Sequence, residues 1–242
     1  MINVYYQTDD VTLYLGDSRE VLPMIEDEFV AAVITDPPYT ERTHSKQRSR
    51  WDNNRGKDII TEGVTEFAAI TDEDLREALS ACGRVSRGWV IATLDYRHAI
   101  EFDVEPPDGL KCQRVGVWVK TNPTPQLTGD RPGQGWEAIS YLHRADRRSV
   151  WNGRGVAGNY VSAIAAPTGH PTAKPLAMIQ DMVRKFTNPG DLILDPFAGS
   201  GTTLRAALNE GRRAIGVEQD ERYCELIANR LGQMVLDLGG MP

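Results

Sequence analysis

A short apolar run leads into the glycine-rich segment DPFAGSGTT, residues 195–203, which opens a helical pattern. Its two glycines let the backbone turn tightly and approach a ligand closely. A second apolar run ends in Glu218, 23 residues after Asp195, close to the roughly 20 residues between a glycine loop and a ribose-binding acid in nucleotide folds. No G-K-[S/T] follows, and the third glycine of the dinucleotide fingerprint is missing. The expected ligand is therefore a nucleoside without phosphates; a glycine turn followed by a surface Glu is the alternative.

A second candidate site follows the apolar run 30–35 and reads Asp36-Pro37-Pro38-Tyr39. The prolines fix the backbone and remove two amide donors, so acceptor groups dominate the loop. Tyr39 adds an aromatic face. Because ligands in open α/β sheets bind beyond the carboxyl ends of the strands, this loop should share a rim with the glycine-rich segment. The combination favours a site for a planar group that bears an amino function; an ordinary proline turn is the alternative.

The elements that must position these loops are visible as apolar runs and helical patterns. Several runs are apolar throughout, as in strands that are covered on both faces. The predicted strands are Thr12–Leu15, Val30–Thr35, Val90–Leu94, Gly116–Lys120, Leu192–Leu194 and Ala214–Glu218. The predicted helices cover residues 72–80, 175–187, 202–209 and 221–231, with Gly211 and Gly232 as stops after the last two. Strands that alternate with helices predict an α/β fold with a doubly wound, mostly parallel sheet.

Length and composition set the outer limits. The chain has 242 residues, 40% of them hydrophobic, and a formal net charge of −7, which is typical of one globular domain over residues 1–242. Three cysteines without a C-x-x-C spacing indicate neither a disulfide framework nor a zinc site, so no metal is expected. No apolar run approaches the length of a membrane span or a signal peptide, and a cytoplasmic protein is expected.

Taken in order, the motifs resemble those of the S-adenosylmethionine-dependent DNA amino-methyltransferases, the N6-adenine/N4-cytosine family. The D-P-P-Y motif precedes the F-x-G-x-G motif here, which resembles the β-class arrangement. Four further segments resemble family segments in the same order: LGDS at 15–18, WVKTNP at 118–123, WE at 136–137 and HPTAKP at 170–175. The resemblance covers nearly the whole chain. It implies a Rossmann-like methyltransferase fold with permuted motif order, in a prokaryotic or phage-encoded enzyme.

The resemblance also implies roles for individual residues. Asp36, Pro37, Pro38 and Tyr39 would form the catalytic loop, in which Asp36 and the Pro37 carbonyl accept the hydrogens of the target amino group while Tyr39 stacks on the flipped base. S-adenosylmethionine would be the cofactor. Its predicted contacts are Glu218 to the ribose, Asp195 to the methionine ammonium, Asp17 near the adenine, Lys174 near the methionine carboxylate, and Phe197, Gly199, Ser200, Gly201 and Thr202 around it.

Two local clusters of positive charge are candidates for contact with double-stranded DNA, because phosphate contacts dominate DNA affinity. The first lies in the segment 40–66, predicted as a basic DNA-contact loop with Arg42, Lys46, Arg48, Arg50 and Arg55. The second carries Arg144, Arg147 and Arg148. In β-class relatives the recognition element follows the middle segments, so residues 138–169 are predicted to be a short target-recognition segment. Its shortness, together with the resemblance, predicts a short recognition site and a homodimer.

The expected reaction is methyl transfer to the N6 amino group of adenine in DNA, in a restriction-modification or orphan enzyme. Asp36 favours adenine, since N4-cytosine relatives of this arrangement usually carry Ser in that place. N4-cytosine is the first alternative. The others are RNA or protein amide methylation, of which the related protein-glutamine enzymes generally carry N-P-P-Y, and a DNA-binding module without turnover. No cysteine follows a proline, so a covalent cysteine mechanism is disfavoured.

Overall fold

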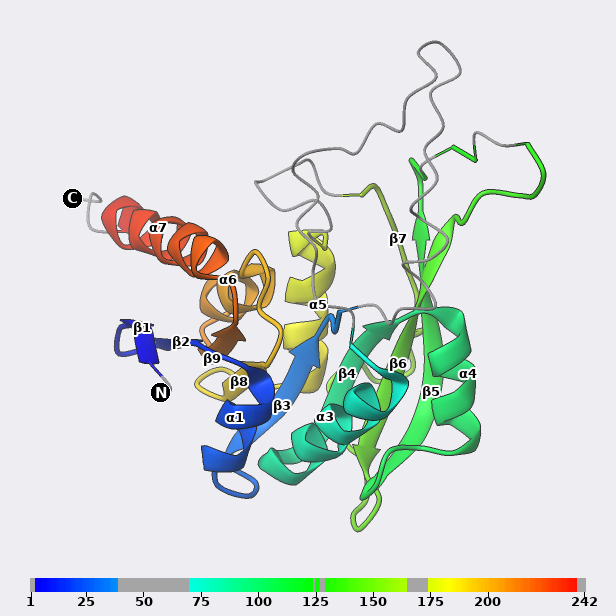
Figure 1. The fold of residues 1–242 in the computed structure, drawn as a ribbon, viewed down its shortest axis with the longest axis horizontal. Helices are drawn as coiled ribbons and strands as arrows, with labels where there is room; N and C mark the ends of the chain where they lie inside the picture. Colours follow the sequence, from blue (N-terminus) through cyan, green and yellow to red (C-terminus); the bar gives the residue numbers. More distant parts are fainter. Residues whose placement is uncertain (1–2, 39–69, 124, 127–128, 165–173, 239–242) are drawn as a thin grey trace.

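The computed structural model describes residues 3–38, 70–123, 125–126, 129–164 and 174–238, which form one nine-stranded sheet with helices on both faces (Figure 1). The strands are β1 (Asn3–Gln7), β2 (Val11–Leu15), β3 (Val30–Thr35), β4 (Ser86–Leu94), β5 (Leu110–Lys120), β6 (Trp136–Arg144), β7 (Tyr160–Ser162), β8 (Leu192–Asp195) and β9 (Arg213–Glu218). The helices are α1 (Ser18–Val21), α3 (Asp72–Val85), α4 (Tyr96–Val104), α5 (Leu176–Phe186), α6 (Thr202–Asn209) and α7 (Glu221–Leu238), with a 3-10 turn at Leu22–Met24.

The strand order across the sheet is β1-β2-β9-β8-β3-β4-β6-β5-β7. The five strands from β2 to β4 run parallel, whereas β6 is antiparallel to both β4 and β5. Leu94 lies opposite Ala138, and Val119 lies opposite Trp136. The carboxyl ends of the parallel strands, the start of β6 and the end of β5 therefore share one edge, which we call the carboxyl edge. The predicted doubly wound, mostly parallel sheet is confirmed.

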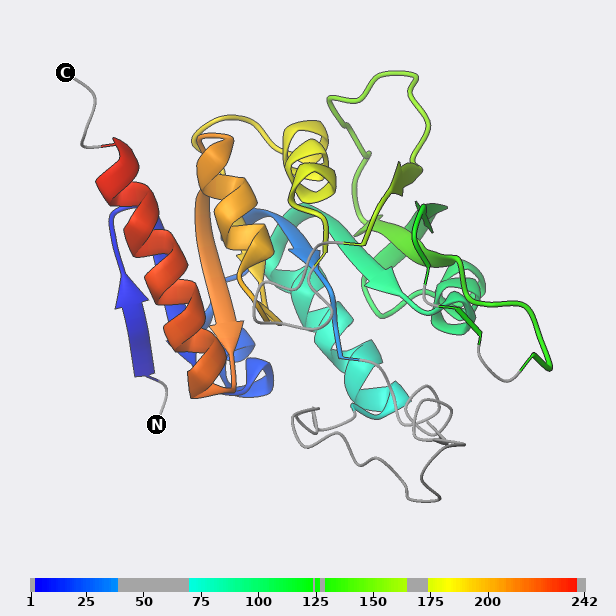
Figure 2. The same ribbon diagram turned by 90° about the horizontal axis from the view of Figure 1, so that it is seen from above.

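Side chains on successive strand positions enter two separate cores, because a strand alternates between its faces. Ile34 of β3 belongs to the core that contains Met182 of α5 and Leu204 of α6. Its neighbour Val33 belongs to the core that contains Leu79 of α3. Figure 2 shows α5 and α3 on opposite sides of the central strands. Both faces are thus covered, which explains why β3 reads as a continuous apolar run.

The bounds of the helices and strands show which elements the local sequence pattern predicts correctly. The predictions for β3 and α6 match the structure residue for residue. Strand β6 was missed because Glu137, Ser140 and His143 interrupt its apolar pattern, although it is a central strand between β4 and β5. The stop predicted at Gly232 is wrong, since α7 continues to Leu238. A helix-interior glycine costs only about 1 kcal/mol relative to alanine, so packing of the rest of the helix can override it.

The segment 138–169, predicted as a target-recognition segment, is largely structural. Its first seven residues lie within β6. The loop that follows is fastened to the body, since Trp89 Nε1 donates to the Val150 carbonyl at 2.7 Å and the Asn152 amide donates to the Lys185 carbonyl at 2.7 Å. Residues 160–162 then pair with β5 as β7. The recognition role that the family resemblance predicts for this segment stays a prediction; residues 165–169 lie outside the described part.

Among the residues that the structure describes, no helix is long and apolar enough to cross a bilayer. In the same part of the chain, no group of three or more His, Cys, Asp or Glu side chains could hold a metal ion. The three cysteines are free thiols, of which Cys82 and Cys224 are buried.

Candidate functional site

Glu218 at the end of β9 is the point where three loops of the carboxyl edge meet. The side chain is buried, and its Oε2 accepts from the Gly199 amide at 2.8 Å while its Oε1 accepts from the Asp220 amide at 2.9 Å. Its carbonyl accepts from the Gly16 amide at 3.0 Å. Burial raises the pKa of Glu218, although these amides oppose the shift. The carboxylate is therefore held in place by neutral donors.

Asp195 at the end of β8 is a second carboxylate of the same kind, only 3% exposed. Its Oδ1 accepts from the Thr35 hydroxyl at 2.7 Å and from the Phe197 amide at 3.1 Å. Burial raises the pKa of Asp195 to about 6. Among the residues that the structure describes, neither Asp195 nor Glu218 forms an ion pair with a lysine or arginine. Two buried carboxylates without a cation suit a ligand that offers hydroxyls and positive charge.

The loop between β8 and α6 depends on glycine for backbone and packing reasons. Gly199 has φ 52° and Gly201 has φ 76°. Residues with a side chain rarely adopt such positive φ angles, whereas glycine adopts them readily. A Cβ on Gly201 would also lie 2.9 Å from Cγ1 of Ile227. The Arg230 guanidinium donates to the Ser200 carbonyl at 2.7 Å and fastens the loop to α7. The structure thus brings the glycine-rich segment and Glu218 together, as predicted.

Asp17 lies beside Gly16 and hence next to the backbone of Glu218. It caps α1, where it accepts from the Arg19 amide at 2.8 Å and from the Arg19 guanidinium Nη2 at 2.7 Å. These hydrogen bonds to Arg19 hold the pKa of Asp17 below its usual range. The position fits the predicted neighbourhood of the cofactor, but the carboxylate already has a partner. Its predicted contact with the cofactor adenine stays a prediction.

Asp36 continues β3 at the carboxyl edge, and both of its oxygens have donors. The Thr93 hydroxyl of β4 donates to Oδ1 at 2.5 Å, and the Lys174 ammonium donates to Oδ2. Two donors from different elements fix the rotation of the carboxylate about its bond to Cβ. Each oxygen keeps a second lone pair that can accept a further hydrogen.

Lys174 connects Asp36 to a second carboxylate. Its Nζ lies 3.3 Å from Oε2 of Glu137, whose Oε1 accepts from Lys120 Nζ at 2.6 Å. The groups form a row of alternating charge, Asp36–Lys174–Glu137–Lys120, along the ends of β3, β6 and β5. Burial raises the pKa of Glu137, but the two lysines outweigh it and hold the pKa below its usual value. Lys174, predicted beside the methionine carboxylate of the cofactor, is placed instead between Asp36 and Glu137.

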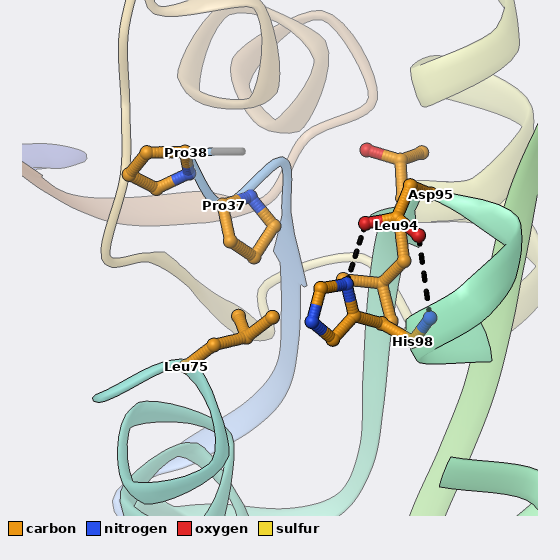
Figure 3. A pocket seen from close by; sticks show the side chains of 7 residues that line it. Pro37, Pro38, Leu75, Leu94, Asp95 and His98 are labelled. Carbon is orange, nitrogen blue, oxygen red and sulfur yellow. Dashed lines mark hydrogen bonds and ion pairs between the residues drawn. The ribbon is translucent and has the colours of Figure 1, made fainter. Parts of the chain in front are cut away.

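Behind the two prolines lies a cavity of about 10 Å³, which gives room for about one water molecule. Figure 3 shows Pro37 and Leu75 facing the His98 ring across it. His98 Nδ1 lies 2.5 Å from Asp95 Oδ2, and Nε2 lies 3.1 Å from Asp72 Oδ1. The hydrogen bond to Asp95 is the main reason that the pKa of His98 is raised. A charged cluster thus supports the prolines from the α3 and α4 side; Tyr39 lies outside the described residues.

The predicted DNA contacts divide into two groups. Arg42, Lys46, Arg48, Arg50 and Arg55 lie outside the described residues. Arg144, Arg147 and Arg148 lie within the described residues, and their contact with DNA stays a prediction. Because His143 pairs with Trp89, near the start of β4, these arginines follow the end of β6 at the opposite edge of the sheet. Arg147 is 2.8 Å from Glu28, and Arg144 is 2.7 Å from Asp146, so nearby acids offset the charge that the sequence count presented as a patch.

Sequence reasoning assigned no role to four residues that shape the site: Thr35, Thr93, Glu137 and Lys120. The available signal was a polar side chain inside or at the end of an apolar strand pattern, as for Thr93 in the run VIATL. Glu137 and Lys120 lie in segments that resemble family segments, but the resemblance assigned no role to either residue. Their mutual contact depends on the pairing of β5 with β6, which the sequence did not reveal.

Comparisons with known proteins agree with this geometry. Residues 143–230 match the DNA methylase family model N6_N4_Mtase. The chain is 26% identical over 248 residues to the type II methyltransferase M.HinfI of Haemophilus influenzae, covering 92% of this chain and 68% of that protein. It is 26% identical over 262 residues to the type II methyltransferase M2.DpnII of Streptococcus pneumoniae, covering 96% of this chain and 93% of that protein.

Solved structures share the fold. The crystal structure of the M1.HpyAVI–SAM complex superposes with a TM-score of 0.67 at 24% identity, covering 91% of this chain and 99% of that one. The carboxylate-bearing loops of this chain, its strand order and these relatives agree with one another. The chain is similar to the DNA methylases of the N6_N4_Mtase family and to type II DNA methyltransferases.

Proposed function

We propose that the protein methylates the N6 amino group of adenine in DNA, with Asp36 as the group that binds the amino hydrogens. The observation that carries the proposal is the Asp36 carboxylate, fixed by Thr93 and Lys174 at the carboxyl edge. Asp36 directly follows β3, and the adjacent β8 ends in Asp195, whose side chain accepts from Thr35, the residue before Asp36. The proposed acceptor of the amino group and the proposed cofactor residues therefore lie at the ends of two neighbouring strands.

The residues present fit S-adenosylmethionine. When bound, this cofactor supplies an electrophilic methyl group on a sulfonium, and its leaving group is a neutral thioether. Glu218 would hold the ribose hydroxyls, and Asp195 would hold the methionine ammonium, since both are buried carboxylates with only neutral donors. The loop from Phe197 to Thr202 would surround it.

The chain's own contribution is to orient the acceptor nitrogen. The lone pair of an exocyclic amino group is delocalised into its ring, which makes the group a poor nucleophile. Asp36 accepts one amino hydrogen and the Pro37 carbonyl accepts the other, which localises the lone pair on nitrogen and directs it away from both acceptors. Catalysis then consists of positioning and preorganised electrostatics. Because the amino group is inaccessible within a duplex, the base must be flipped out.

The choice of base rests on Asp36. A carboxylate forms stronger, charge-assisted hydrogen bonds than the hydroxyl that N4-cytosine relatives of this arrangement usually carry. N4-cytosine is the second candidate, because its amino group would fit the same acceptors. Incubation of the protein with S-adenosylmethionine and unmethylated plasmid DNA, followed by nuclease digestion and mass spectrometry, distinguishes the two. N6-methyldeoxyadenosine is expected; N4-methyldeoxycytidine alone would overturn the base assignment, and no methylated nucleoside would overturn the activity.

We further propose that DNA lies across the carboxyl edge. Tyr96 and Trp136 are 42% and 37% exposed there, with ring centroids 6.2 Å apart, and Arg97 lies over the Tyr96 ring. Exposed aromatic rings can stack on unpaired bases. The basic sequence from residue 40 to 57 follows the catalytic loop and would add phosphate contacts. Alanine at Arg48, Arg50 and Arg55 should lower the log–log salt slope of DNA binding by about 0.9 per lost contact; an unchanged slope would exclude these contacts.

The assembly proposed on family grounds is a homodimer. The short stretch available for target recognition gives a physical reason, since two subunits could share one duplex. Light scattering at micromolar protein, with and without DNA, should give twice the 26.9 kDa mass of the chain. A monomer under both conditions would refute the dimer.

A further inference from the structure

Lys174 lies between two carboxylates that hold it unequally. It donates a hydrogen bond to Asp36 Oδ2, whereas Glu137 Oε2 lies 3.3 Å from Nζ. Glu137 Oε2 is fully buried and has no well-aligned hydrogen-bond donor in the part of the chain that the structure describes. A buried carboxylate oxygen in that state is costly unless a donor can reach it. The Lys174 ammonium therefore has a second acceptor at 3.3 Å, which is within ion-pair distance but forms no well-aligned hydrogen bond with it.

The hydrogen bond from Lys174 to Asp36 has the same form as the one proposed for the target base. In both, an N–H group donates to the Asp36 carboxylate. The other oxygen of Asp36 already accepts from Thr93 at 2.5 Å. Before a base arrives, the Lys174 ammonium therefore occupies one lone pair of Oδ2, and the target amino group must either share that oxygen with the ammonium or displace it.

We propose that Glu137 is a positioning residue that accepts the Lys174 ammonium when the target amino group binds Asp36. The proposal rests on the proposed function. The movement keeps the buried positive charge paired in both positions, which matters because an unpaired buried charge is strongly destabilising. Lys120 makes it possible: by bonding Oε1 at 2.6 Å, it holds Glu137 with Oε2 toward Lys174.

A purely structural role for Glu137 has a different consequence. It would stabilise the fold through Lys120 and leave the occupancy of Asp36 unchanged. In the exchange proposed here, a neutral side chain at 137 leaves the ammonium on Asp36, and the target amino group must displace it without compensation. A neutral side chain at position 137 should therefore lower the rate of methyl transfer and leave the affinity for the cofactor unchanged, because Glu137 lies on β6 and not in the loops that follow β8 and β9.

The variant Glu137→Gln keeps the shape and removes the charge. Its matched control is Glu210→Gln: Glu210 accepts from Arg184 at 2.6 Å, its side chain is 15% exposed against 14% for Glu137, and it follows α6 at the opposite edge. The measurement is single-turnover transfer of the tritiated methyl group to unmethylated plasmid DNA, with enzyme in excess and S-adenosylmethionine saturating. Cofactor affinity is measured by calorimetry.

We expect the single-turnover rate to fall about 10- to 100-fold in Glu137→Gln, the effect of one charge-assisted hydrogen bond. Cofactor affinity and the control should stay within twofold of the wild type. Glu137→Asp, which keeps the charge, should recover part of the rate. A rate within twofold of wild type in Glu137→Gln, or no recovery in Glu137→Asp, would overturn the proposal.

A double-mutant cycle with Lys174→Met tests the route of the effect. If Glu137 acts only through Lys174, adding Glu137→Gln to Lys174→Met costs no further rate; a full additional loss would contradict the exchange. The double variant removes both charges of the pair, so it leaves no unpaired charge from this pair. Thermal melting of each variant shows whether a low rate of methyl transfer comes from misfolding. Absence of methylation by the wild-type protein would instead refute the proposed function itself, whereas a wild-type protein that methylates beside an unaffected Glu137→Gln would refute only the exchange.

Discussion

The carboxyl edge has two halves, which differ in whether their carboxylates have a lysine as a partner. In the half formed by β8 and β9, Asp195 and Glu218 accept only from hydroxyl and amide groups among the described residues, and burial raises both pKa values. In the half formed by β3, β6 and β5, Asp36 and Glu137 are paired with Lys174 and Lys120. The same chemical group is therefore left without a cation in one half and supplied with one in the other.

The ligands explain the difference. S-adenosylmethionine brings a sulfonium and an ammonium, so carboxylates that wait for it can be left without a protein cation. The target base is neutral when it arrives, and a carboxylate that binds it must be compensated by the protein itself. An uncompensated buried charge raises the free energy of the folded state until its ligand binds. The cofactor half should thus gain more stability from its ligand than the target half gains from DNA.

The largest effect is expected from Asp36→Ala. It removes the amino-group acceptor and should lower the rate of methyl transfer by at least about 10²-fold, by analogy with the loss of one preorganised hydrogen-bonding group in other active sites. Affinity for S-adenosylmethionine, measured by calorimetry, should change little because Asp36 belongs to the other half. If turnover is retained, or if cofactor binding is lost, the division of the edge into two halves is wrong.

Glu218→Gln probes the cofactor half alone. Loss of charge-assisted hydrogen bonds to the ribose should weaken cofactor binding by about 10- to 100-fold. At saturating cofactor the single-turnover rate should recover to near the wild-type value. Titration of the rate against cofactor concentration measures both quantities. A rate that stays low at saturation would mean that Glu218 also positions the reacting groups.

Sequence alone predicted that the glycine-rich loop and Glu218 lie together, but it did not reveal the partners of Asp36. Asp195, the glycines and Glu218 lie within one β-α-β stretch, where spacing along the chain decides spacing in the fold. The partners of Asp36 come from residues 93, 120, 137 and 174, and they meet only through the pairing of β4, β5 and β6. Missing β6 therefore hid Glu137, and it also hid the position of Arg144, Arg147 and Arg148 at the opposite edge of the sheet. Long-range pairing of that kind leaves no short-range signal.

Asp195→Asn tests whether the uncompensated carboxylate weakens the free protein. Burial raises the pKa of Asp195 from its ordinary value of 3.8 to about 6. The folded state therefore binds the proton more tightly than the unfolded state, and stability falls as the pH rises from 3.8 to about 6, then stays level. Asparagine keeps an oxygen for Thr35 and Phe197 but carries no charge. Without cofactor, the variant should be more stable than wild type above pH 6, by up to about 3 kcal/mol.

Thermal melting of both proteins between pH 5 and 8 measures this difference. The gain in Tm should shrink as the pH is lowered through 6, and saturating S-adenosylmethionine should reverse the order at pH 7.5, because only the wild type binds it well. Equal Tm values across this range would show that the carboxylate is compensated after all.

The smallest effect is expected at His98, a cation that no substrate is proposed to displace and that can therefore be compared with Lys174. His98 bridges Asp95 and Asp72 behind Pro37 and Pro38, and its pKa is raised. The imidazolium stabilises the fold fully below the unfolded pKa of about 6.5, and this contribution is lost as the pH rises through the higher folded value. His98→Gln should therefore lower the Tm at pH 6 by about 2–4 °C, for about 1 kcal/mol, with a smaller loss at pH 9.

His143→Gln is the matched control for that measurement. His143 is also buried, but its pKa is lowered, mainly by burial, and its Nδ1 lies 2.9 Å from the Arg144 carbonyl at the opposite edge. It is neutral above pH 7, so the Tm loss on its replacement should stay constant from pH 7 to 9. His98 differs from Lys174 in that each of its ring nitrogens already has a carboxylate partner, Asp95 or Asp72. Lys174 instead lies near a buried carboxylate oxygen, Oε2 of Glu137, that has no hydrogen-bond partner among the described residues. If His98→Gln slows single-turnover transfer as much as Glu137→Gln does, charge exchange is not peculiar to the target half, and the contrast between a displaceable and a permanent cation fails.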